Sequence, residues 1–110
     1  MIIPFHTASE EAYPSFKGGE KELSAKMFFD GANRILWGRL VPGATIGLHT
    51  HENDCEAVYV LEGEGVFLYD GTPESAPAGA CHYCPKGHSH SLSNALPDKD
   101  LVFFAVVPRQ

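Results

Sequence analysis

The stretch that decides the fold spans residues 43–63 and reads Gly43-ATIGL-His49-Thr50-His51-ENDC-Glu56-AVYVLE-Gly63. Side chains two positions apart in a β-strand point to the same face, so an extended backbone aims His49 and His51 together. Glu56 opens the next apolar run, in which Val58 and Val60 share its face. A carboxylate at the head of inward-facing valines is costly unless a positive group neutralises it. A cation held by the two imidazoles and the carboxylate meets that need.

A second stretch spans residues 79–94 and reads Gly79-ACHYC-Pro85-Lys86-Gly87-HS-His90-SLS-Asn94. After its Pro-x-Gly turn, His90 enters another short apolar run and supplies a third imidazole from a neighbouring strand. His88 shares the face of His90 if the strand has already begun there, and we expect it to contact substrate at the rim of the site. The alternatives of a spare ligand or a proton shuttle stay open for His88.

Short apolar runs, separated by Gly, Pro, Asn and Asp, follow one another after the first 24 residues. They are rich in Val, Ile, Leu and aromatic residues, and none shows a sustained helical period. We expect strands at Ala25–Phe29, Arg34–Val41, Thr45–His49, Glu56–Leu61, Gly65–Tyr69, Ala80–Cys84, His90–Ser93 and Leu101–Val107. So many short strands in one small chain predict an all-β sandwich or barrel.

The chain of 110 residues is short enough to form a single domain. Within it we expect a short irregular N-terminal arm at residues 1–24 and the barrel at residues 25–110. The arm is polar and contains Pro14 and a Gly-Gly pair, while Ser9 followed by two glutamates is compatible with a short helix over residues 9–12.

Charge and cysteine content exclude several classes of protein. The net charge is −6 and the eight basic residues are scattered, which argues against nucleic-acid binding. No apolar run is long enough to span a bilayer, and the N-terminus shows no secretory signal pattern, so we expect no membrane partner and a cytoplasmic location.

Cys81-His82-Tyr83-Cys84 spells C-x-x-C, but the two thiols of such a strand face opposite ways and no second pair exists. We therefore expect all three cysteines to be buried free thiols, and His82 to point outward or to pack.

Both stretches resemble the two conserved motifs of the cupin superfamily at every fixed position. A lone His-x-His pair is more typical of solvated surface, but the ordered match of both motifs identifies a small single-domain cupin. The resemblance implies a jelly-roll barrel (a double-stranded β-helix). It also implies that one divalent transition-metal ion (Fe, Mn, Ni, Cu or Zn) is bound by His49, His51, Glu56 and His90. The other motif positions are interpreted as structural, for turns and strand entry: Gly43, Gly63, Gly79, Pro85, Gly87 and Asn94.

Cupins include oxygenases, lyases, isomerases and non-catalytic proteins, so the fold alone does not choose a function. Because the ligand set is complete, we expect a small metal-dependent enzyme of the oxygenase (including dioxygenase), lyase or isomerase class. It would act on a small polar or anionic substrate in the barrel. The alternative is a non-catalytic binding or sensor protein whose metal is structural or orients a ligand. An open cavity holding a further acid or base favours the enzyme, and a cavity filled by apolar side chains favours the alternative.

Two arginines are candidates for binding a carboxylate of the substrate. They lie on opposite faces of the strand expected at residues 34–41. If Trp37 faces inward, Arg39 is the anchor; if Leu36 and Leu40 face inward, Arg34 takes that role near the barrel mouth.

We also expect a homodimer. The arm and the aromatic-rich strands carry more apolar surface than so small a barrel covers internally, and the resemblance implies pairing through a sheet face or by exchange of N-terminal strands.

Overall fold

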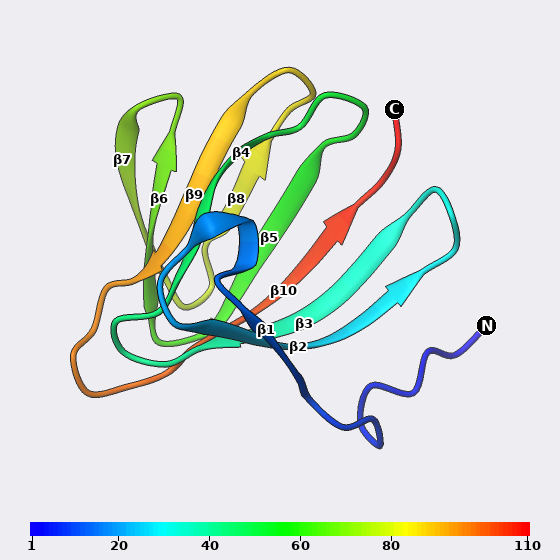
Figure 1. Cartoon of the computed structure of the whole chain (residues 1–110), viewed down its shortest axis with the longest axis horizontal. Helices are drawn as coiled ribbons and strands as arrows, with labels where there is room; N and C mark the ends of the chain where they lie inside the picture. Colours follow the sequence, from blue (N-terminus) through cyan, green and yellow to red (C-terminus); the bar gives the residue numbers. More distant parts are fainter.

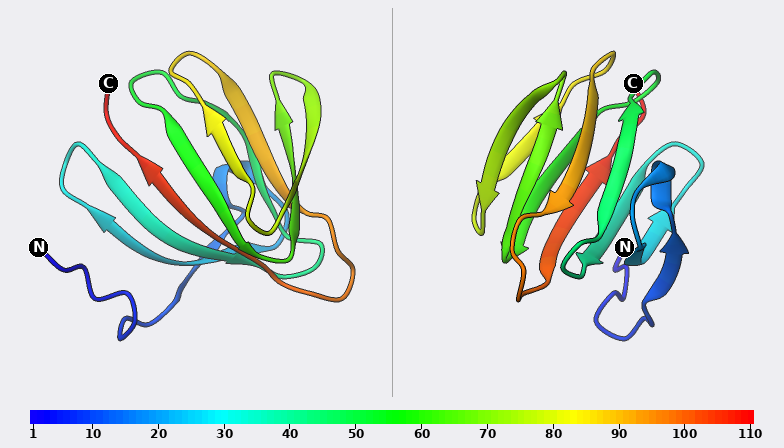
Figure 2. Two further views of the ribbon diagram at one scale, coloured as in Figure 1. Left: turned by 180° about the vertical axis from the view of Figure 1, so that it is seen from behind. Right: turned by 60° about the vertical axis from the view of Figure 1, so that its left-hand side comes forward.

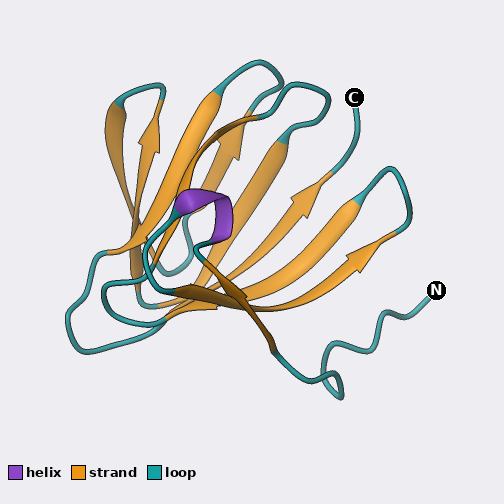
Figure 3. Cartoon of the chain, viewed as in Figure 1, coloured by secondary structure: helices purple, strands orange, loops and turns teal.

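The computed structural model describes all 110 residues, and its strands form two facing antiparallel β-sheets (Figures 1 and 3). The six-stranded sheet has the order β1 (Glu11–Pro14), β2 (Glu22–Phe29), β3 (Arg34–Leu40), β10 (Leu101–Val107), β5 (Glu56–Glu62) and β8 (Cys81–Cys84). The four-stranded sheet has the order β4 (Thr45–Thr50), β9 (Ser89–Asn94), β6 (Glu64–Tyr69) and β7 (Thr72–Pro77). Figure 2 shows the same strands from behind and from the side, with the first residues extending away from the barrel. The all-β jelly-roll prediction is confirmed.

The eight expected strands are all present, and the structure adds β1 and β7. Strand β7 carries Pro73 and Pro77, which argue against a strand because proline lacks the N–H of a ladder bond. The structure accommodates them because β7 lies at the edge of its sheet and pairs only with β6. The β6–β7 connection is an Asp70-Gly71 turn, in which the two residues have positive φ angles of 46° and 83°.

The N-terminal arm has no strand before Glu11 and then joins the barrel through β1, the 3₁₀ turn η1 (Phe16–Gly18) and the first residues of β2. No helix forms over residues 9–12, where Ser9 and the two glutamates are compatible with one. The arm packs backbone against backbone on β4: a Cβ added at Gly19 would lie 2.0 Å from the carbonyl oxygen of Thr45, and one at Gly47 2.0 Å from that of Lys17. Only glycine allows so close an approach.

The core lies between the two sheets and is built by alternate residues of their strands. Its large side chains that are less than one-tenth exposed include Leu23, Leu36, Leu40, Ile46, Val58, Val60, Phe67, Leu92, Leu101 and Phe103. Burying each of them contributes roughly 1.5–3 kcal/mol before entropy is counted. The aromatic ring of Phe103 lies directly over Gly38, where a Cβ would come within 2.4 Å of it. No helix in the structure has the length and apolar character needed to cross a bilayer.

Candidate metal centre

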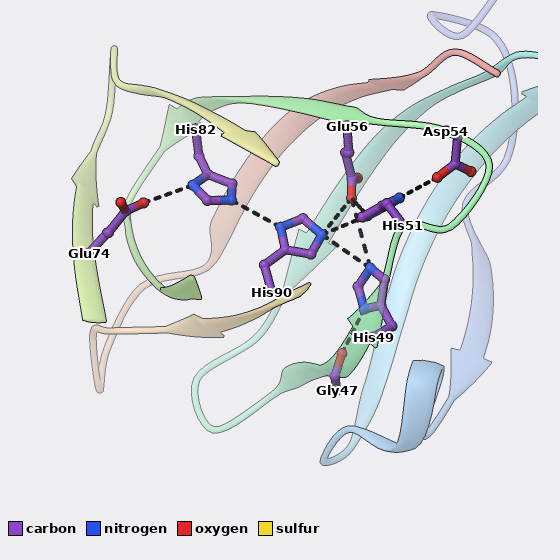
Figure 4. A network of polar contacts seen from close by, with 8 residues as sticks. All are labelled: Gly47, His49, His51, Asp54, Glu56, Glu74, His82 and His90. Atoms are coloured by element: carbon purple, nitrogen blue, oxygen red, sulfur yellow. Dashed lines mark hydrogen bonds and ion pairs between the residues drawn. The ribbon is translucent and has the colours of Figure 1, made fainter. Parts of the chain in front are cut away.

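Three histidines and one glutamate converge at one end of the barrel, where the β4–β5 and β8–β9 turns lie side by side (Figures 1 and 4). His49 is the second-last residue of β4 and lies opposite His90 of β9, His51 follows β4, and Glu56 begins β5. The His90 Nε2 atom lies 2.9 Å from His51 Nε2 and 3.1 Å from His49 Nε2. The Glu56 Oε1 atom lies 2.9 Å from His90 Nε2 and 3.1 Å from His51 Nε2. We call these four side chains the ligand cluster; the sequence predicted all four.

In two of the cluster histidines, the ring nitrogen that points away from the cluster contacts an oxygen that can only accept a hydrogen bond. The His49 Nδ1 atom donates to the carbonyl oxygen of Gly47 at 2.8 Å, and His51 Nδ1 donates to Asp54 Oδ1 at 2.6 Å. Because a carbonyl and a carboxylate only accept, both Nδ1 atoms carry the proton of the neutral ring. Both Nε2 atoms therefore direct a lone pair into the cluster, which is the tautomer that a metal ligand needs.

The donors fit a divalent transition-metal ion. Lone pairs converging beside a carboxylate repel one another unless a cation lies between them. With metal–nitrogen bonds of about 2.1 Å, donors at right angles around an ion are about 3.0 Å apart, and the observed separations of 2.9 and 3.1 Å agree with this value. Imidazole and carboxylate together are a donor set used by Fe, Mn, Ni, Cu and Zn.

Electrostatics keep the cluster carboxylate ionised. Burial alone would raise the pKa of Glu56, but His49, His51 and His90 outweigh it, because their protonated rings hydrogen-bond the carboxylate, and they hold that pKa well below the usual range. Glu56 accepts a hydrogen bond from Nε2 only when the His51 ring is protonated, so it raises the pKa of His51 against the opposing effect of burial, and Asp54 adds to this rise. A buried anion surrounded by three imidazoles is the charge pattern of a cation site.

A cavity of about 260 Å³ opens beside the cluster, which forms part of its wall. Its inner wall is apolar and comes from both sheets: Leu36, Ile46, Val58, Phe67, Leu92 and Phe103. The arm contributes Phe16 and Lys17, so the N-terminal segment helps to shape the site. Charged groups outside the cluster also line the cavity: Lys17, Arg34, Glu52 and Asp54. The cavity is therefore open, mainly apolar inside, and charged in part of its wall.

The burial pattern of β3 decides between the two candidate arginines. Leu36 and Leu40 are buried, so the face that carries Arg34 lines the cavity. Arg34 pairs with Val107 of β10, and the neighbouring Val106 pairs with Ala57, the residue after Glu56 in β5. Two strand spacings separate Arg34 from Glu56, roughly 10 Å. Arg39 lies on the other face, where its guanidinium binds Glu10 and Asp100. It does not line the cavity, so the expectation that Arg39 anchors the substrate is not met.

His88 is placed outside the cavity rather than at its rim. Its Nδ1 atom bonds the carboxylate of Asp70, and the hydroxyl of Tyr69 lies 3.2 Å from the same nitrogen. Its side chain is 44% exposed and is absent from the cavity wall. Its backbone carbonyl accepts the amide N–H of His51 at 3.0 Å, so His88 supports the turn next to the cluster through its main chain.

The remaining motif residues lie in turns or bridge loops. Gly63 has a φ of 79°, and a Cβ there would lie 2.4 Å from the carbonyl oxygen of Asp100; Gly43, Gly79 and Gly87 also have positive φ. The carbonyl oxygen of Pro85 accepts a hydrogen bond from the backbone N–H of His88 across the turn into β9. The amide nitrogen of Asn94 donates to the carbonyl oxygens of Leu40 and Lys99, which ties the loop after β9 to the end of β3.

Sequence reasoning missed the contact of His82 with the cluster and misplaced one cysteine. Of the two expected placements of His82, outward or packed, the structure has the packed one: it is 6% exposed, and its Nε2 atom lies 2.9 Å from His90 Nδ1. Alternation along β8 allows the side chain of His82 to point either into the barrel or out of it. The pairing of β8 with β5 places His82 opposite the buried Val58 and so selects the inner face. Cys55 and Cys84 are buried as expected, whereas Cys81 is exposed. Residues of β8 therefore alternate between core and solvent.

Two facing antiparallel sheets with a three-histidine, one-glutamate cluster at one end define a cupin-type barrel. Residues 36–107 match the Cupin domain family. The chain belongs to the cupin family.

Relatives of known name share this architecture. An oxalate-binding protein of Thermotoga maritima is 33% identical over 113 residues, which cover 97% of this chain and 93% of the relative. The crystal structure of a predicted oxalate decarboxylase from T. maritima superposes with a TM-score of 0.91 and 30% identity, covering 100% of both chains. KdgF from Halomonas sp. superposes with a TM-score of 0.78, 19% identity and coverage of 100% and 94%, a likeness that shows the fold alone.

Proposed function

We propose that this cupin binds one divalent transition-metal ion through His49, His51, Glu56 and His90, and with it a small dicarboxylate of the oxalate type. The observation that carries the proposal is the direction of the hydrogen bonds at His49 and His51, which leaves both Nε2 lone pairs beside an ionised carboxylate. The names given to the T. maritima relative and to the T. maritima crystal structure support the choice of ligand.

The cavity suits a small anion. Once bound, the ion supplies positive charge and the coordination positions that four protein donors leave free for carboxylate oxygens. The chain adds Arg34 and Lys17 in the cavity wall, both of which attract an anion. The apolar inner wall and the volume of about 260 Å³ limit the size of the ligand and exclude water around it.

Metal analysis tests the first half of the proposal. We expect one equivalent of metal per chain after supplementation with Mn²⁺, and less than a tenth of that in His49→Ala. His6→Ala, which removes an exposed arm histidine, is the matched control and should keep full occupancy. A wild-type protein that carries no stoichiometric metal after supplementation contradicts the proposal.

Calorimetric titration with oxalate tests the second half. We expect binding to the Mn²⁺-loaded protein, none to the metal-free protein, and affinity about 10-fold lower in Arg34→Ala, typical of one charged contact. Arg39→Ala should bind as the wild type does, since its guanidinium lies outside the cavity. Equal binding with and without metal would refute the role of the ion.

A metal-dependent lyase is a second candidate function, and one observation favours it. Glu52 lines the cavity yet lies outside the ligand cluster, so its carboxyl group is available as an acid or base. Decarboxylation of oxalate breaks the carbon–carbon bond, releases carbon dioxide and needs one proton on the remaining carbon to give formate. Glu52 is the candidate donor of that proton. Formate release by the metal-loaded wild type, lost in Glu52→Gln with oxalate affinity retained, would establish the lyase; oxalate binding without turnover would leave a binding protein.

We also propose that the protein is a homodimer joined through the outer face of its six-stranded sheet. Trp37, Phe104 and Tyr59 lie directly across from one another on β3, β10 and β5, and Phe104 and Tyr59 are 36% and 45% exposed. A self-complementary apolar row of this kind suits a two-fold interface. Sedimentation should give a dimer for the wild type and a monomer for Phe104→Glu; a monomeric wild type refutes the proposal.

A further inference from the structure

His82 connects the ligand cluster to the surface of the barrel. Its Nε2 atom lies 2.9 Å from His90 Nδ1, and its Nδ1 atom lies 3.0 Å from Glu74 Oε1 (Figure 4). The three residues come from β9, β8 and β7, so the contacts join one sheet to the other. His82 is buried, whereas the side chain of Glu74 is 46% exposed. We call this set the His90–His82–Glu74 relay.

The hydrogen bonds of the relay run in one direction. An ionised carboxylate only accepts, so the Nδ1 atom of His82 must donate to Glu74. A neutral imidazole has a single N–H, which leaves the Nε2 atom of His82 as an acceptor. The proton between the two rings therefore belongs to His90 Nδ1, and the lone pair of His90 is on Nε2, the atom in the ligand cluster.

We propose that His82, oriented by Glu74, is a positioning residue that fixes the metal-binding tautomer of His90. The inference rests on the proposed metal site and adds two residues to it: Glu74, which lies outside both conserved motifs, and His82, which is at a variable position of the second motif. His49 and His51 obtain the same tautomer from a carbonyl and a carboxylate in direct contact. His90 obtains it through an intervening imidazole, an extension of the carboxylate–histidine–metal arrangement.

The competing tautomer shows why the relay matters. The Nε2 atom of His90 lies 2.9 Å from Glu56 Oε1, so in the absence of an acceptor at Nδ1 the ring gains most by donating from Nε2 to Glu56. That proton would occupy the lone pair that the metal requires. An acceptor at Nδ1 removes this competition, because each neutral ring has one proton to donate.

Aromatic packing holds the relay in line. The ring of Phe67 stacks on His82 with centroids 3.8 Å apart and planes 14° apart. The planes of His82 and His90 differ by 20°. Stacking against a buried phenylalanine restricts rotation of the His82 ring, so its Nε2 atom stays directed at His90.

Titration of the metal-free protein with Co²⁺ tests the inference, with the visible absorption spectrum of the bound ion as a second readout. His82→Phe keeps an aromatic ring against Phe67 and removes both nitrogens. We expect about 10- to 100-fold weaker Co²⁺ binding, the range for loss of an outer partner of a ligating histidine, and a shifted spectrum. His82→Gln, whose amide both accepts and donates, should recover most of the affinity, which a merely structural role would not predict.

Two further variants make the test decisive. Glu74→Ala changes a half-exposed side chain, so it is expected to fold and to weaken Co²⁺ binding by about 10-fold. His88→Phe is the matched control, since His88 also bonds a carboxylate but lies outside the cavity, and its Co²⁺ affinity should equal that of the wild type.

The outcomes separate the inference from the proposed function. Wild-type affinity and an unchanged spectrum in both folded His82→Phe and Glu74→Ala overturn the inference alone. If His82→Phe does not fold, unchanged affinity and spectrum in Glu74→Ala are sufficient to overturn it. A wild type that binds no Co²⁺ overturns the proposed metal site itself.

Discussion

The two sides of the ligand cluster are held in different ways. On the β4 side, His49 and His51 bind acceptors that lie two and three residues away in the sequence, at Gly47 and Asp54. On the β9 side, the acceptor for His90 comes from other strands, through His82 and Glu74. Short-range contacts form as soon as the strand and its turn form, whereas the relay requires both sheets to be packed together. One half of the centre is thus organised locally and the other by the assembled barrel.

The largest effect is expected where the two sides meet. Glu56 contacts both His51 and His90, so Glu56→Gln removes a charge that both sides share. We expect Mn²⁺ affinity to fall by more than about 100-fold, beyond the upper end of what loss of an outer partner causes. Competition with a chelator measures it. Glu62→Gln, at the exposed end of the same strand, is the control, and retained affinity in Glu56→Gln would show that Glu56 is not a ligand.

The β4 side is sensitive to its contact with the arm. In Gly47→Ala the new Cβ would meet the carbonyl oxygen of Lys17 at 2.0 Å. We expect a loss of about 1–3 kcal/mol in the free energy of unfolding, as for other overpacked sites. Metal affinity should fall with it, because the carbonyl that orients His49 must shift. Urea unfolding measures the loss, and Leu48→Ala, an exposed change on the same strand, should stay within about 0.5 kcal/mol of the wild type.

The local acceptor of His51 allows a direct comparison with the relay. Asp54→Asn replaces the carboxylate by an amide that still accepts a hydrogen bond but carries no charge. We expect Mn²⁺ affinity about 10-fold lower, near that of Glu74→Ala on the other side. Affinity unchanged by Asp54→Asn but reduced by Glu74→Ala would mean that only the β9 side depends on its outer partners.

The smallest effect is expected at the third histidine–carboxylate pair, His88 and Asp70. Hydrogen bonds from the backbone N–H of Ser89 and from His88 lower the pKa of Asp70 below its ordinary value of 3.8. An acid whose pKa is lower in the folded state stabilises the fold above its unfolded pKa, and this contribution is lost as pH falls through the folded pKa.

Asp70→Asn should therefore be slightly less stable than the wild type at pH 7 and equally stable once Asp70 is protonated. Thermal unfolding at a series of pH values measures the difference, and Mn²⁺ affinity should not change. A difference in stability that grows toward low pH would contradict the assigned shift.

The same contrast explains how much the sequence could predict. His49, His51 and Glu56 follow from strand alternation and apolar context, and the conserved motif that contains them is one contiguous stretch of chain. The relay is not contiguous, and the face of His82 depends on the pairing of β8 with β5. The choice between Arg34 and Arg39 likewise required the burial of Leu36 and Leu40. Strand β7 was missed because its two prolines argue against a strand unless its edge position is known.

Those two prolines have a further consequence for how copies of the chain can associate. Strand β7 leaves one side without a hydrogen-bonded neighbour, and Pro73 and Pro77 flank Glu74 along it. Proline and charge at a free edge discourage the addition of another strand. Edge-to-edge pairing, which would bury the outer end of the relay, is therefore disfavoured at β7. Glu74 stays in contact with water, and any self-association must use a different side of the barrel.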